Sequence, residues 1–85
     1  MIGLKACRAV SVQVIRLLHQ EREDRKLSKY EVAARSGLSP QTISYVEREM
    51  RNPSLETVLR IADAIGVDAA EVIKRANELV SRRAK

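Results

Sequence analysis

The fold of this chain is decided between Leu27 and Glu47, where the sequence reads LSKYEVAARSGLSPQTISYVE. Ser28 is followed three residues later by Glu31, which is the spacing of a capping box, so a helix is predicted to begin at Ser28. That helix should end near Ser36, because Gly37 can adopt the left-handed backbone conformation that terminates helices. The segment therefore opens with a short helix and a tight turn.

A second short helix is predicted directly after this turn. Ser39 can cap it, and Pro40 suits the first helical position, which needs no backbone N–H. The three-and-four spacing of Ile43, Val46 and Met50 predicts the buried side of this helix. Its opposite side then carries four side chains that can hydrogen-bond, namely Gln41, Ser44, Tyr45 and Arg48. Two short helices joined by a glycine-containing turn are typical of proteins that place the second helix in the DNA major groove.

Three more helices are predicted in the rest of the sequence, and the chain of 85 residues is expected to form a single domain. Residues 1–10 are expected to form an N-terminal arm, with a short strand or an early helix start as alternatives. A helix is expected from near Ser11, with Val14, Ile15 and Leu18 inward, into the polar run that ends at Lys26.

Beyond the break at Asn52 and Pro53, a helix capped by Ser54 and ended by Gly66 is predicted. Its expected buried stripe is Leu55, Val58, Leu59, Ala62 and Ile65. The last helix should begin at Asp68 and run to about Arg82.

Composition narrows the classes of function. The net charge of +5 favours a polyanionic partner such as nucleic acid. We expect no enzyme, no cofactor and no metal, because the chain is short and shows no metal cluster, catalytic triad or phosphate-binding glycine loop. The single cysteine, Cys7, fits a reducing cytoplasm, and the charges in the apolar N-terminal segment argue against a membrane span.

The sequence from Ser28 to Glu47, followed by RNPSLETVLRIADAIGV from Arg51 to Val67, resembles the Cro and phage-repressor helix-turn-helix family, also called the xenobiotic-response-element family. This resemblance implies an all-α, five-helix, lambda-repressor-like domain. It also implies sequence-specific binding of double-stranded DNA, dimerisation and regulation of transcription.

The resemblance further implies which residues contact DNA. The residues expected to face base edges are Pro40, Gln41, Ser44 and Tyr45, and those expected to contact phosphates are Lys29, Thr42, Arg48, Arg51 and Asn52. Two residues depart from the family pattern: Pro40 stands where many members have Gln, and Glu49 stands where Gly is common. At Glu49 we expect either an unusual backbone conformation or a different path of the chain.

Two further contacts are expected. Glu47 is predicted to pair with Arg22, as in many members of the family, although both could instead be solvated surface charges. A homodimer is predicted through a seam on the last helix, made of Ala69, Ile73, Ala76, Leu79 and Val80. The alternative is that Leu79 and Val80 fold back onto the first helix of the same chain.

Three functions remain open at this stage. The first is a transcriptional regulator that acts as a repressor and reads the major groove with residues 39–48. The second is an antitoxin that binds both DNA and a toxin. The third is a protein-interaction module that has kept the fold and lost DNA binding.

Overall fold

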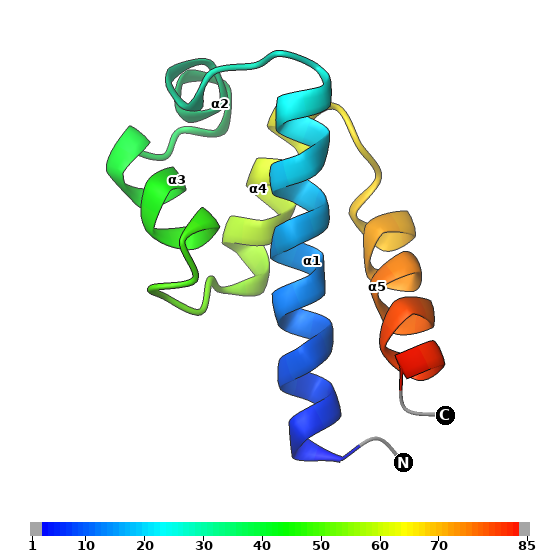
Figure 1. Ribbon diagram of the computed structural model, residues 1–85. Helices are drawn as coiled ribbons and strands as arrows, with labels where there is room; N and C mark the ends of the chain where they lie inside the picture. The colour runs from blue at the N-terminus through cyan, green and yellow to red at the C-terminus, as the bar shows by residue number, and fades with distance from the viewer. Residues whose placement is uncertain (1–2, 84–85) are drawn as a thin grey trace.

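The computed structural model describes residues 3–83 and contains five helices and no strand in this range. The helices are α1 (Leu4–Asp24), α2 (Lys29–Ser36), α3 (Pro40–Glu47), α4 (Leu55–Ile65) and α5 (Ala69–Arg83). α1 stands at the centre, with α2 and α3 on one side and α5 antiparallel to it on the other (Figure 1). The predicted all-α, lambda-repressor-like fold is confirmed.

The predicted helix punctuation is also confirmed. Ser28 and Glu31 form the reciprocal capping box of α2, and the side chains of Ser39 and Ser54 cap α3 and α4. α2 ends at Gly37, whose φ of 75° is left-handed. The α2–α3 turn therefore has the geometry that its residues predict.

The N-terminus follows the alternative of an early helix start rather than the predicted arm. α1 begins at Leu4 rather than near Ser11, so the arm predicted for residues 1–10 is helical from residue 4, and only its first two residues lie outside the described range. No strong helix breaker separates Gly3 from Asp24, and the early turns pack against α5, with Val10 half-buried against the core. The strand alternative is wrong for the same reason.

The buried stripe of α4 is wrong in part. Leu55 and Leu59 are 65% and 48% exposed, whereas Ile61 and Ala64 are buried in their place. α4 packs against α1, α2 and α5 together, so its buried arc is wider than one stripe and is rotated away from the two leucines. Met50 is also exposed, because α3 ends at Glu47 and Met50 lies in the turn that follows.

The apolar face of α5 is already used within the chain. α5 makes its most extensive packing with α1, and Ala76 is fully buried there. Ala69 and Ile73 pack half-buried against the core, and Leu79 and Val80 are also half-buried. The predicted dimer seam on α5 is therefore wrong at Ala76, and the packing favours the alternative in which α5 covers its own chain.

Candidate nucleic-acid interface

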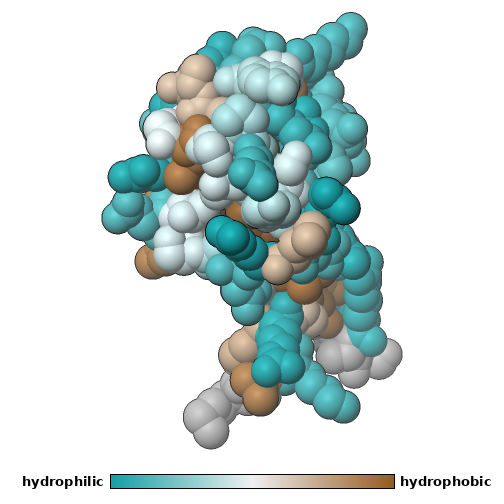
Figure 2. Space-filling model, turned by 90° about the vertical axis from the view of Figure 1, so that its left-hand side faces the viewer, coloured by the Kyte–Doolittle hydropathy of each residue, from teal (hydrophilic) through white to brown (hydrophobic). Residues whose placement is uncertain are grey.

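The largest fully buried side chains in the described range hold the helices α2 and α3 against the core. Val32 of α2 and Ile43 of α3 are 0% and 1% exposed. With these side chains directed inward, the opposite face of α3 is left to the solvent. That face is largely hydrophilic, with only small hydrophobic areas (Figure 2). The fold thus presents a polar helix face on a rigid support.

Gln41 and Tyr45 form a linked pair on this face. The Nε2 of Gln41 donates a hydrogen bond of 2.6 Å to the hydroxyl oxygen of Tyr45, one helical turn away. The guanidinium of Arg51 lies 5.0 Å from the centre of the Tyr45 ring, within the range of a cation–π contact. The side-chain oxygen of Gln41 and the second N–H of its side-chain amide make no hydrogen bond within residues 3–83. The amide can therefore still accept one hydrogen bond and donate another outward.

Lys29 lies beside the same face rather than apart from it. Its Nζ donates a hydrogen bond of 3.0 Å to the Oγ of Ser44, and so joins the start of α2 to the middle of α3. Lys29 was expected at a phosphate and Ser44 at a base edge. The structure brings these two side chains together, which places a positive charge next to the residues expected to read bases.

Residues of both helices line one open hollow: Lys29, Tyr30, Pro40, Gln41, Ser44, Tyr45 and Arg48. Tyr30 was not predicted here, although its side chain is 75% exposed at the second position of α2. Its position next to Lys29 is the only signal in the sequence that could have indicated it. No side chain that lines the hollow is acidic.

The other residues expected to contact phosphates are less uniformly placed. Thr42 is half-buried, and its hydroxyl lies 2.9 Å from that of Ser39, within the cap of α3. Arg51 and Asn52 are exposed in the loop between α3 and α4, outside the hollow. The residues expected to contact phosphates thus divide among the hollow, the cap of α3 and the loop that follows α3.

Glu49 adopts the unusual conformation, the first of the two expected outcomes. Its φ is 60°, a left-handed value that costs a non-glycine residue energy. The N–H groups of Glu49 and Met50 bond to the carbonyl oxygens of Val46 and Tyr45, so the end of α3 is closed in the way that glycine usually permits. Its carboxylate lies 3.4 Å from the Nε of Arg16, which offsets its negative charge.

Arg22 of α1 and Glu47 of α3 form a two-pronged ion pair. The Nε and Nη2 of Arg22 donate to the two carboxylate oxygens of Glu47 at 2.6 and 3.0 Å. The two side chains are only 11% and 9% exposed. The hydrogen bonds to Glu47 raise the pKa of Arg22 above its usual value. The third nitrogen of Arg22 donates to the carbonyl of Leu27 at 2.8 Å, so this one side chain joins α1, the start of the α2 segment and α3.

Within residues 3–83, no group of three His, Cys, Asp or Glu side chains is placed to hold a metal ion. In the same range, no helix is both long and apolar enough to cross a membrane.

Comparison with known proteins gives a consistent set of matches. A family model described as helix-turn-helix matches residues 18–72. An uncharacterised HTH-type transcriptional regulator of Sinorhizobium fredii is 40% identical over 57 residues, which are 67% of this chain and 74% of that protein. The immunity repressor protein of Bacillus phage phi105 is 33% identical over 52 residues, which are 61% of this chain and 36% of the repressor.

An uncharacterised HTH-type transcriptional regulator of Mycobacterium tuberculosis is 37% identical over 62 residues, which are 73% of this chain and 44% of that protein. The aligned part of the chain thus spans less than half the length of the phage and mycobacterial relatives. No solved structure gave a significant match.

Proposed function

This chain belongs to the helix-turn-helix family of the Cro and phage-repressor type, and we propose that it is a sequence-specific repressor that reads double-stranded DNA with α3. The coarser assignment, a DNA-binding regulator of transcription, follows from the family membership. That family is one of DNA-binding regulators rather than of enzymes. We also place its action in the cytoplasm.

The observation that carries the proposal is the composition of the hollow on α2 and α3. Its polar side chains are neutral or basic, and they converge from two helices that the core holds rigidly. DNA presents hydrogen-bonding base edges in the major groove and negative phosphates on both sides of it. A surface with neutral readers on α3 and cations beside them is complementary to both features.

Within this surface the roles divide by chemistry. The Gln41 amide can accept from the N6 amino group of adenine and donate to its N7, even while its other N–H is held by Tyr45. Ser44 and the ring of Tyr45 would contact neighbouring bases in this proposal, and Pro40 can offer only an apolar contact. Lys29, Thr42, Arg48, Arg51 and Asn52 supply the phosphate contacts, which fix the register of α3 but do not read sequence.

The repressor assignment rests on two supports. One relative, at 33% identity, is named an immunity repressor protein. The second support is physical: a domain of this size that occupies the major groove excludes other proteins from the same site, and so represses without any additional activity.

The proposal is tested by selecting bound sequences from a random duplex library and then measuring affinity for the selected and for scrambled duplexes at several salt concentrations. We expect a defined site that is bound about a thousandfold or more tighter than scrambled DNA. Lys29→Ala should weaken binding to both duplexes and reduce the salt slope by about one. Glu78→Ala, a charge change on the exposed side of α5, is the control and should leave binding to both duplexes intact. Enrichment of no sequence, with equal affinity for all duplexes, would refute sequence-specific reading.

A further inference from the structure

Arg51 lies over the ring of Tyr45 because the chain turns back directly after α3. The N–H of Glu49 donates to the carbonyl of Val46 at 3.0 Å. The N–H of Met50 donates to the carbonyl of Tyr45 itself at 2.9 Å. These two hydrogen bonds, with Glu49 in the left-handed conformation, form the Schellman closure of a helix. The next residue, Arg51, is thereby returned to the last turns of α3, where its guanidinium lies 5.0 Å from the centre of the Tyr45 ring.

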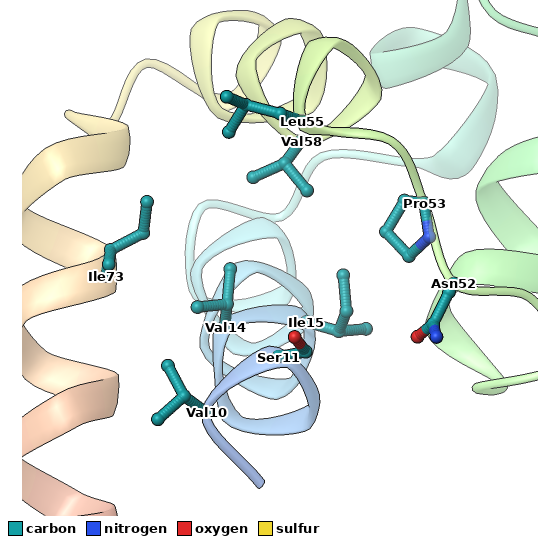
Figure 3. A pocket seen from close by; sticks show the side chains of 9 residues that line it. All are labelled: Val10, Ser11, Val14, Ile15, Asn52, Pro53, Leu55, Val58 and Ile73. Carbon is teal, nitrogen blue, oxygen red and sulfur yellow. The ribbon is translucent and has the colours of Figure 1, made fainter. Parts of the chain in front are cut away.

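The loop that carries Arg51 is also held on its far side. Asn52 and Pro53 line a largely apolar groove, and Pro53 is half-buried there (Figure 3). The same groove is lined by Ile15 of α1 and Val58 of α4. The proline ring fixes its own φ and restricts the backbone of the residue before it. Arg51 therefore stands between two fixed points, the closed end of α3 and the packed proline.

The hydroxyl of Tyr45 in turn sets the direction of the Gln41 amide. The hydroxyl oxygen accepts one N–H of that amide at 2.6 Å. With this N–H held, the amide presents one acceptor and one donor outward. Adenine offers the matching donor and acceptor at N6 and N7, whereas guanine offers two acceptors at O6 and N7. An amide turned over, with its oxygen toward the hydroxyl, would present two N–H donors and would suit guanine instead.

We propose that Tyr45 and Arg51 are positioning residues for base specificity, which hold the Gln41 amide in the orientation that selects adenine over guanine. The inference rests on the proposed function, because it concerns the same reading surface of α3. Arg51 holds the Tyr45 ring by a cation–π contact, and the ring places the hydroxyl that orients the amide. Because the amide is oriented before DNA arrives, less rotamer freedom is lost on binding.

The preference for one base tests the proposal. It is measured as the ratio of dissociation constants for duplexes that differ, A·T against G·C, at the base pair where Gln41→Ala removes the preference of the wild type. Tyr45→Phe keeps the ring and removes only the hydroxyl, and we expect it to lower this ratio by at least about fivefold. Arg51→Gln should lower the same ratio, whereas loss of a phosphate contact alone would weaken binding to both duplexes equally.

Two further variants separate an effect through Gln41 from a general one. Tyr30→Phe is the matched control, because it removes the hydroxyl of the other tyrosine of the hollow, which makes no hydrogen bond to Gln41 within residues 3–83. It should leave the ratio unchanged. The double variant Gln41→Ala with Tyr45→Phe should show the same ratio as Gln41→Ala alone, because the hydroxyl acts through the amide.

Circular dichroism checks that each variant folds. If Tyr45→Phe does not fold, the NMR signals of the Gln41 side-chain amide in the wild type decide in its place, and free rotamer averaging of that amide would overturn the proposal. A folded Tyr45→Phe that keeps the wild-type ratio would also overturn it and would leave the proposed function standing, as would a wild type that prefers G·C at this base pair. Enrichment of no sequence by the wild type would refute the proposed function, and this proposal with it.

Discussion

Replacing Glu47 by Ala should destabilise the fold far more than removal of an ordinary surface charge. Glu47 accepts two hydrogen bonds from Arg22, and both side chains are about nine-tenths buried. Without the carboxylate, the Arg22 guanidinium keeps only its hydrogen bond to the carbonyl of Leu27 and remains largely shielded from water. An uncompensated buried charge costs about 3–5 kcal/mol. Because that one hydrogen bond is retained, we expect the free energy of unfolding to fall by the lower end of this range, about 3 kcal/mol.

Urea unfolding followed by circular dichroism measures this loss. For a domain of this size, about 3 kcal/mol corresponds to a fall in melting temperature of roughly 12–24 °C. The matched control is Glu56→Ala, which breaks the exposed pair with Arg60 and should cost less than about 1 kcal/mol. The double variant Arg22→Ala with Glu47→Ala should show coupling, with a combined loss smaller than the sum of the single losses. A loss below about 1 kcal/mol for Glu47→Ala would refute the reasoning that this pair ties α1 to α3.

Three further outcomes follow from the structure. Gln41→Ala should cost about 1–3 kcal/mol on the selected duplex and little on scrambled DNA, and equal losses on both would refute its reading role. Glu49→Gly should raise the free energy of unfolding by about 1 kcal/mol, because glycine adopts a φ of 60° without strain and the exposed pair with Arg16 is worth little; an unchanged or lower stability in urea would count against strain at this position. The capping box lowers the pKa of Glu31 below its usual value, chiefly through the hydrogen bond from the Ser28 backbone. The stabilisation by the charged Glu31 carboxylate is therefore present above the unfolded-state pKa and is lost as the pH falls through the folded-state pKa. The stability difference between wild type and Glu31→Gln should therefore shrink in acid, and a difference that is constant with pH would argue against the charged cap.

The parts of the fold that the sequence predicted are those set by neighbouring residues. A cap at Ser28, Ser39 or Ser54 needs only a backbone N–H three residues away, and the turn at Gly37 needs only its own freedom of φ. The shared face of Gln41, Ser44 and Tyr45 follows from helical spacing alone. These features do not depend on how the helices pack.

The parts that the sequence missed depend on contacts between distant segments. Gly3 offers no side-chain cap, so the start of α1 is not marked locally, and α5 packs on those first turns from more than sixty residues away. Leu59 and Ile61 are equally apolar, and only the positions of three neighbouring helices decide which is buried. The bond from Lys29 to Ser44 likewise depends on the angle between α2 and α3, which no spacing within one helix encodes.

The two segments outside the family match have a common place in the molecule. The match covers residues 18–72, so the first fourteen residues of α1 and the last eleven of α5 lie outside it. They lie side by side at the same end of the molecule, away from α2 and α3 (Figure 1). The surface proposed to read DNA, on α2 and α3, thus lies within the matched residues, whereas the ends of α1 and α5 that lie outside the match are placed away from it.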